Sequence, residues 1–233
     1  MTYATLDSSL HHILATLLLT VGALLPIVDP LSSAPLYLQM TSGLTPDERA
    51  AMAKAVARDS FLLLLSCAFV GAYVLDFFGL SIPAVQVAGG MVLCAMGWKL
   101  LNRPDVPDAL ARATAAEAEI GNLRRRAFYP LTMPLTVGPG SISVAITLGA
   151  NPHRDVRSLF VTAFGHALGI LVVAAAVYLC YRYAHALVRW LGDTGRSVVI
   201  RLSSFILLCI GVQIAWNGIH AMVVATFPGS AVG

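Results

Sequence analysis

The sequence has 233 residues, of which 58% are hydrophobic and only 12% are charged, with a formal net charge of +3. A soluble domain usually carries roughly 25% charged residues, so this composition excludes an ordinary soluble enzyme and favours a protein whose surface faces lipid. The small net charge gives no support for a nucleic-acid partner.

Six apolar windows follow one another along the chain, at roughly 13–40, 59–78, 83–101, 128–150, 158–183 and 202–224. A bilayer core needs about 20 helical residues to be crossed, so the windows predict an all-α, polytopic membrane protein with six transmembrane helices. No window alternates polar and apolar residues with a period of two, which argues against membrane strands. The first window is unusually long, and Pro26, Pro30 and Pro35 interrupt it.

The basic residues predict the orientation of these helices. With the two chain ends on one side, the first, third and fifth loops lie on the other side and hold 13 of the 15 Lys and Arg residues. Cytoplasmic loops carry the excess of positive charge. We therefore expect both termini outside the cytoplasm and the long third loop, residues 102–127, inside it.

The two halves of the chain resemble each other, which predicts an internal repeat. Residues 28–32 read Val-Asp-Pro-Leu-Ser and correspond to Val-Gly-Pro-Gly-Ser at residues 137–141. Three-span units in tandem must insert with opposite topology, as in many secondary transporters. We therefore expect a 3+3 inverted-topology repeat with broken first and fourth helices, made of residues 1–101 and 128–233 around the loop 102–127.

The prolines of the first and fourth windows break those helices at equivalent positions. Proline removes a backbone donor, and at membrane depth the freed groups must find partners or line a wet cavity. Ser32 or Ser33, and Ser141, are predicted to cap half-helices whose N-terminal N–H groups suit a carboxylate. We expect a solute site near the midplane, made of Asp29, Pro30, Ser32, Ser33, Gly138, Pro139, Gly140, Ser141, Gln213 and Asn217. The alternative is a pair of structural kinks satisfied by neighbouring helices.

Asp29 and His166 are ionisable residues expected at membrane depth, where such groups are costly and usually functional. Asp29 either couples transport to protons or caps the half-helix that follows, and His166 either relays protons or bonds to a neighbouring helix. Gln213 and Asn217 share one helix face and either line the site or bond across the bundle. The four cysteines have no metal-ligand spacing, so we expect free thiols, no metal and no cofactor.

At the breaks the sequence resembles the MarC family of bacterial membrane proteins, also called the neutral amino-acid transporter family. The family pattern Asn-Pro-Ile-Gly-Asn-x-Pro-Ile-Phe stands here as Asp-Pro-Leu-Ser-Ser-Ala-Pro-Leu-Tyr at residues 29–37, and Pro-Leu-x-x-Gly-Pro-Gly stands at residues 134–140. Gly89 and Gly90 match a family glycine pair, and Arg201, 211–213 and 217–219 match the pattern of the sixth span. The resemblance implies six spans in a bacterial inner membrane and, for some members, transport or export of small neutral amino acids.

Asp29 departs from the family pattern, because an acid replaces the family's amide. Ser32 and Ser33 likewise replace Gly and Asn. A deprotonated Asp29 would repel the carboxylate of a solute bound at the break, whereas a protonated one would not.

Together these patterns predict a transporter or exporter of a small polar metabolite, a neutral amino acid being one candidate, with the solute and the lipid bilayer as partners. The alternatives are a passive channel or facilitator and a structural or signalling membrane protein. A membrane-embedded enzyme is not expected, because the spans contain no HExxH, P-loop or clustered metal ligands. Solute, direction, coupling ion and oligomeric state are left open.

Overall fold

The computed structural model describes residues 2–102, 127–150 and 156–226, and every regular element within these ranges is helical. The predicted loop 102–127 therefore lies almost wholly outside the described residues. The elements are α1 (Thr2–Val28), α2 (Pro30–Met40), α3 (Pro46–Phe77), α4 (Ile82–Leu101), η1 (Ala127–Thr136), α7 (Pro139–Gly149), α8 (Val156–Arg182) and α9 (Ala184–Thr226).

Several of these helices are long and apolar enough to cross a membrane. Within the described residues, four stretches meet this condition: Leu10–Leu38, Pro46–Phe77, Leu159–Arg182 and Arg201–Thr226. A fifth crossing is obtained if η1 and α7, which bend by 75° at their junction, form one broken span. The third predicted span, 83–101, corresponds to α4, a helix of 20 residues that is not among these candidates, so the six-span arrangement stays a prediction.

Helix α3 begins 13 residues before the predicted window, so Arg49, Lys54 and Arg58 lie on a helix and not in a loop. The cause is local, because Thr45 and Glu48 form a reciprocal capping box and Pro46 occupies the first helical position. The extension is stable because Met52, Ala53, Val56 and Ala57 on one of its faces are buried.

The predicted fifth loop is also helical. Helix α9 starts at Ala184 and is interrupted at Gly192, whose φ of 60° and ψ of −178° suit glycine and few other residues. Arg189 therefore lies on a short helical segment that precedes the kink. Polarity alone suggested a loop here, but a single non-helical glycine is enough to connect two helical segments that run in different directions.

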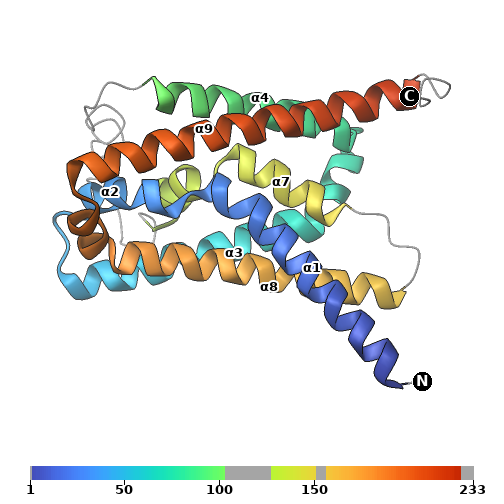
Figure 1. The fold of residues 1–233 in the computed structure, drawn as a ribbon, viewed down its shortest axis with the longest axis horizontal. Helices are drawn as coiled ribbons and strands as arrows, with labels where there is room; N and C mark the ends of the chain where they lie inside the picture. Colours follow the sequence, from blue (N-terminus) through green and yellow to red (C-terminus); the bar gives the residue numbers. More distant parts are fainter. Residues whose placement is uncertain (1, 103–126, 151–155, 227–233) are drawn as a thin grey trace.

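The helices run between two ends of the molecule. In Figure 1, the right-hand end of the molecule holds the start of α1, the turn from α3 to α4, the end of α7, the start of α8 and the end of α9. The end of α2, the start of α3, the end of α4 and the turn from α8 to α9 lie at the left. The connections thus alternate between the ends, as the predicted topology requires, while the sidedness in the membrane stays a prediction.

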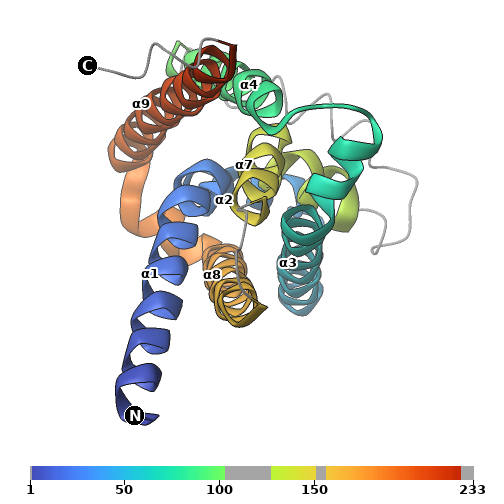
Figure 2. The same ribbon diagram turned by 90° about the vertical axis from the view of Figure 1, so that its right-hand side faces the viewer.

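The two halves of the chain are packed into each other. α1 packs on α8, whereas η1 and α7 pack on α3. In the same crossed manner, α2 contacts α9 and α7 contacts α4. Figure 2, viewed along the bundle, shows α2 and α7 in the middle, with the α4–α9 pair on one side and α3 and α8 on the other. The broken segments are therefore enclosed by helices from both halves.

α4 and α9 form an antiparallel pair with close backbone contact. A Cβ atom on Gly90 would lie 2.5 Å from the amide nitrogen of Ala215, and one on Gly97 would lie 2.9 Å from that of Leu208. Gly211 and Gly218 make equivalent approaches to α4. The two glycines of each helix, Gly90 and Gly97 on α4 and Gly211 and Gly218 on α9, are seven residues apart. Both glycines of a helix therefore stay on its contact face over two helical turns.

Candidate functional site

The first helix break lies at Asp29, as the proline pattern predicts. Asp29 has a φ of 38°, and its N–H donates to the carbonyl of Leu25 at 2.9 Å while its own carbonyl accepts from the Ser33 N–H at 3.2 Å. The N–H of Ser32 donates to the Asp29 carboxylate at 3.3 Å. The predicted cap by Ser32 or Ser33 is thus wrong: Asp29 caps α2, because it directly precedes the first helical residue, Pro30, which is buried.

Hydroxyl groups surround the Asp29 carboxylate. Besides Ser32, the side chain of Ser203 on α9 faces it, and Cys180 and Tyr181 at the end of α8 are close enough to interact with its charge. Three helices, α2, α8 and α9, therefore meet at this carboxylate. Its partners among the described residues are an amide and hydroxyls, none of which carries a positive charge.

The second break separates η1 from α7, and glycine and proline residues form it. Gly138 precedes α7 in extended conformation, with a ψ of 176°, and Pro139 occupies the first helical position. The predicted cap by Ser141 is wrong, because its hydroxyl donates to the Gly138 carbonyl at 2.9 Å instead of accepting an N–H. The N-terminus of α7 therefore has no side-chain cap, in contrast to that of α2.

The start of α7 is packed on α4. Gly140 and Ser141 are buried, whereas Pro139 is exposed. A Cβ on Gly140 would overlap the side chain of Leu93, which would have to move, but one on Gly138 would meet nothing closer than 3.8 Å. The space beside Gly138 is the less crowded side of this N-terminus.

η1 owes its irregular shape to a repeated tetrapeptide, Tyr-Pro-Leu-Thr followed by Met-Pro-Leu-Thr. Tyr129 and Met133 have extended backbone, and each precedes a cis proline. In each repeat the threonine hydroxyl donates to a carbonyl five residues earlier: Thr132 to Ala127 at 2.8 Å and Thr136 to Leu131 at 2.7 Å. These hydroxyls provide side-chain donors to backbone carbonyls inside a segment that departs from regular α-helix.

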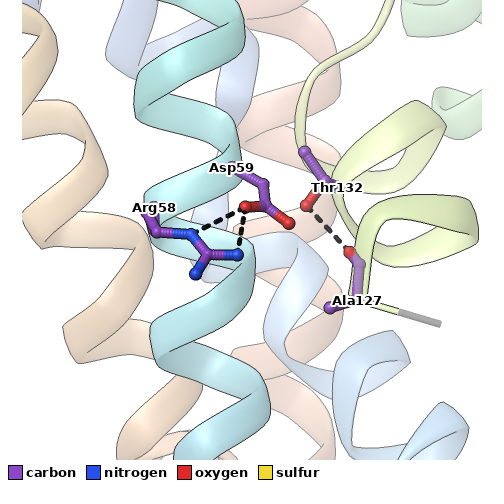
Figure 3. A network of polar contacts seen from close by, with 4 residues as sticks. All are labelled: Arg58, Asp59, Ala127 and Thr132. Atoms are coloured by element: carbon purple, nitrogen blue, oxygen red, sulfur yellow. Dashed lines mark hydrogen bonds and ion pairs between the residues drawn. The ribbon is translucent and has the colours of Figure 1, made fainter. Parts of the chain in front are cut away.

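An ion pair on α3 lies beside η1. Arg58 donates to the Asp59 carboxylate from Nε at 2.9 Å and from Nη2 at 2.8 Å. Figure 3 shows that the Asp59 carboxylate lies between the Arg58 guanidinium and Thr132 of η1. The side chain of Asp59 is 14% exposed and that of Arg58 is 50% exposed. Asp59 is therefore largely buried beside η1, whereas Arg58 extends to the surface of α3.

A buried chain of hydroxyl groups connects the two breaks. The hydroxyl of Tyr181 on α8 is 2.8 Å from Oγ1 of Thr136, next to the second break, and it also faces the hydroxyl of Ser33 in α2. The ring of Tyr181 stacks on that of Tyr37 with centroids 4.4 Å apart, and both rings are fully buried. Val28 and Val137, each beside a break, belong to the same buried cluster. The breaks therefore share one interior region, as expected.

His166 does not belong to this region. It is buried on α8, and its Nδ1 is 2.8 Å from the hydroxyl of Thr20 on α1. Because that hydroxyl donates to the Thr16 carbonyl at 2.7 Å, it accepts from His166, so Nδ1 carries a proton. Thr20 precedes Asp29 by nine residues, which is about 13 Å along a helix. Of the two alternatives for His166, the hydrogen bond to a neighbouring helix is present.

Gln213 and Asn217 also lie away from the breaks. Both are exposed on α9, and Nε2 of Gln213 donates to Oδ1 of Asn217 at 2.9 Å. They bond to each other along one helix, not across the bundle as expected. The reason is that Gly211 and Gly218 turn their face of α9 toward α4, which leaves the amides on other faces.

Four residues of this interior were not among the predicted site residues: Tyr37, Thr136, Tyr181 and Ser203. Tyr37 and Thr136 lie inside the segments that resemble family patterns, so their hydroxyl groups could have been recognised from the sequence as candidates for the interior. Tyr181 and Ser203 belong to distant helices, and no local pattern distinguishes them from lipid-facing residues.

The sequence has clear relatives. Residues 14–223 match the family described as MarC family integral membrane protein. A protein named inner membrane protein MarC from Escherichia coli (strain UTI89 / UPEC) is 30% identical over 202 residues, which cover 84% of this chain and 90% of that protein. The protein of the same name from Salmonella paratyphi B is 29% identical with the same coverage. No solved structure matches the chain.

Proposed function

The chain belongs to the MarC family of integral membrane proteins, and from this premise we propose that it carries a small polar metabolite across the bacterial inner membrane. A neutral amino acid is the first candidate. The solute and the lipid bilayer are its proposed partners, and it catalyses no reaction. Both termini lie outside the cytoplasm in this proposal, as the distribution of basic residues favours.

The observation that carries the proposal is the meeting of two helix breaks in one buried, hydroxyl-lined region. Broken helices that start half-helices inside a membrane protein are typical of solute sites in secondary transporters. The α2 N-terminus is already capped by Asp29, whereas that of α7 has no side-chain cap. A solute carboxylate would therefore bind at the start of α7, beside Gly138, where backbone N–H groups and the helix dipole favour an anion.

The crossed packing of the two halves supports an inverted repeat as the frame of this site. In such a repeat every contact between halves has a counterpart with the roles exchanged. The contact of α2 with α9 corresponds to that of α7 with α4, and the contact of α1 with α8 corresponds to that of η1 with α3. Alternating access would then proceed by movement of one set of helices against the other around the breaks.

Transport by purified protein in liposomes tests the proposal. We expect saturable uptake of one or more neutral amino acids from a panel, above the level of empty liposomes, and counterflow when the vesicles contain unlabelled solute. A bulky residue at Gly138, such as Gly138→Leu, should abolish uptake, because it fills the space beside the α7 N-terminus. Gly22→Leu is the matched control, since a Cβ on Gly22 meets nothing within 4 Å.

Two outcomes would contradict the proposal. Uptake that rises linearly with solute concentration and shows no counterflow would indicate the passive channel instead. Retention of full activity by Gly138→Leu would exclude the α7 N-terminus as the solute site.

A further inference from the structure

We propose that Asp29, Ser32 and Ser203 form a binding site for a monovalent metal cation, with Na⁺ as the occupant. The site lies where α2 begins and α9 passes it, next to the solute site. The inference deepens the proposed function, on which its use as a coupling-ion site rests, while cation binding itself can be measured without any transport.

The charge of Asp29 is the first reason. A carboxylate at membrane depth is stable only if a positive charge or sufficient donors compensate it. The Ser32 N–H donates at 3.3 Å, a long hydrogen bond, and the other partners of the carboxylate in the described chain are neutral hydroxyls. The described part of the chain therefore supplies no positive charge to the shell around this group, and a bound cation would supply one.

The arrangement of oxygen atoms is the second reason. The Ser32 hydroxyl faces the carboxylate, yet its oxygen is fully buried and has no hydrogen-bond partner within the part of the chain that the structure describes. Buried hydroxyls normally form hydrogen bonds. Oxygens that share a hard cation sit about 2.3–2.6 Å from it, and hence too far apart to bond directly to each other. The unpaired Ser32 hydroxyl beside a carboxylate is thus an oxygen that a cation could bind together with that carboxylate.

The break supplies a further oxygen. Position 30 is proline and has no N–H, so the carbonyl of Pro26, four residues earlier, lacks its usual helical donor. The carbonyls at the end of a helix point along its axis toward the following residues, here toward the break. Carbonyls of unwound or terminal helical segments are common Na⁺ ligands in transporters.

Charge balance selects a monovalent ion. A single carboxylate neutralises one positive charge, whereas a divalent cation would leave a net charge of +1 in a low-dielectric region. A proton needs only the carboxylate and has no use for two hydroxyls. The hydroxyls of Ser32 and Ser203 thus distinguish a metal cation from a proton, because their loss weakens the binding of the cation but removes groups that favour the charged carboxylate, and so strengthens the binding of a proton.

Thermal denaturation of the purified protein in detergent, without solute, tests the proposal. A cation that binds the folded state raises Tm with its concentration. We expect saturable stabilisation by NaCl relative to choline chloride at equal ionic strength, and a weaker response at lower pH because protons compete for Asp29. Ser203→Ala and Ser32→Ala should weaken the apparent Na⁺ affinity by about tenfold or more. Ser204→Ala is the control, because Ser204 packs beside Gly97 of α4.

Asp29→Asn should abolish the response of Tm to Na⁺, although its amide oxygen can still accept the Ser32 N–H. If the Asp29→Asn protein fails to fold, the two serine variants decide whether Na⁺ binds at this site. Stabilisation by NaCl no greater than by choline chloride would overturn the proposal. A wild-type response to Na⁺ in both Ser203→Ala and Ser32→Ala would also overturn it. Competition between glycine and Na⁺ would do the same, because it would show that Asp29 binds the ammonium group of the solute. None of these results depends on whether the liposome assay detects transport.

Discussion

Tyr181 is the residue that joins the two breaks most directly. Its ring is fully buried against Tyr37, and its hydroxyl has a partner on each side, Thr136 near the second break and Ser33 in α2. A buried hydroxyl without a partner is costly, so the partners fix the position of the phenol. Tyr181 thereby holds α8 against both broken segments.

Tyr181→Phe keeps the ring stack and removes only the hydroxyl, so we expect a loss of about 1 kcal/mol in the free energy of unfolding. Thr136→Val should cost more, because it also removes the hydrogen bond to the Leu131 carbonyl, and the double variant should cost less than the two together because they share one hydrogen bond. Denaturation in mixed detergent micelles measures these differences. Tyr183→Phe is the control, since Tyr183 is 59% exposed. Equal stability of Tyr181→Phe and the wild type would show that the hydroxyl does not stabilise the junction.

At the scale of elements, α4 and α9 are held together by close packing of their backbones. Between helices in lipid there is little hydrophobic driving force, so close packing of small residues stabilises the contact. The glycines of both helices let backbone meet backbone along two heptads. This pair covers the broken segments from one side, since α2 contacts α9 and α7 contacts α4.

Gly90→Ala should destabilise the protein by about 1–3 kcal/mol, the usual cost of overpacking, because its Cβ would lie 2.5 Å from the nitrogen of Ala215 and 2.6 Å from the oxygen of Gly211. Gly22→Ala serves as the control and should be neutral or slightly stabilising, because its Cβ meets open space within a helix. The Tm of the two variants in detergent gives the comparison. A Gly90→Ala protein as stable as Gly22→Ala would exclude a tight α4–α9 contact at this point.

The element pattern shows which features are readable from sequence. The breaks at Asp29–Pro30 and Gly138–Pro139 were predictable, because proline chemistry acts locally. The caps were predicted only in part: one of the two alternatives for Asp29, a cap on the half-helix that follows it, is confirmed, whereas the caps by Ser32 or Ser33 and by Ser141 were wrong because several short polar residues compete for each N-terminus. The helical starts of α3 and α9 were missed because polar helices outside the apolar windows resemble loops.

The position of side chains around a helix was harder to predict. Gln213 and Asn217 were correctly placed on one face by their spacing, but nearly all faces of α9 are apolar, so the pattern could not tell which face is inside. The approach of Ser203 to Asp29 joins residues 174 positions apart, and only the tertiary packing of α2 on α9 creates it.

At the scale of the whole molecule, neither half of the chain can bury its own helices. α1 packs on α8, and α3 packs on η1 and α7, so each half provides the surface on which the other half's broken helix rests. Exposed glycine, serine and carboxylate groups would remain in each half alone. The two halves are therefore expected to be stable only together.

Expression of residues 1–101 and 128–233 as separate fragments tests this dependence. We expect each fragment alone to be degraded, and the two fragments expressed together to accumulate and to copurify through a tag on either one. The intact chain is the reference for abundance. Accumulation of a single fragment at the level of the pair would contradict the interlocked arrangement.

The sidedness of the molecule follows from its charges. Because 13 of the 15 basic residues lie within the predicted first, third and fifth loops or in the helical segments that replace parts of them, reporter fusions at both termini should be active outside the cytoplasm, and fusions within 102–127 should be active inside it. A fusion at Ser81, in the turn between α3 and α4, should behave like the termini. A cytoplasmic C-terminus together with an external N-terminus would show that an odd number of segments crosses the membrane.

The place of Asp29 within its helix gives the cation site an electrical property. Asp29 stands about two-thirds of the way along the stretch Leu10–Leu38. A full crossing of the membrane changes the energy of a unit charge by about 2.3 kcal/mol per 100 mV, so entry from the α2 side would involve roughly a third of that, about 0.8 kcal/mol. Membrane voltage alone would thus alter occupancy severalfold, and a cell's resting potential would set how often the carboxylate holds its ion.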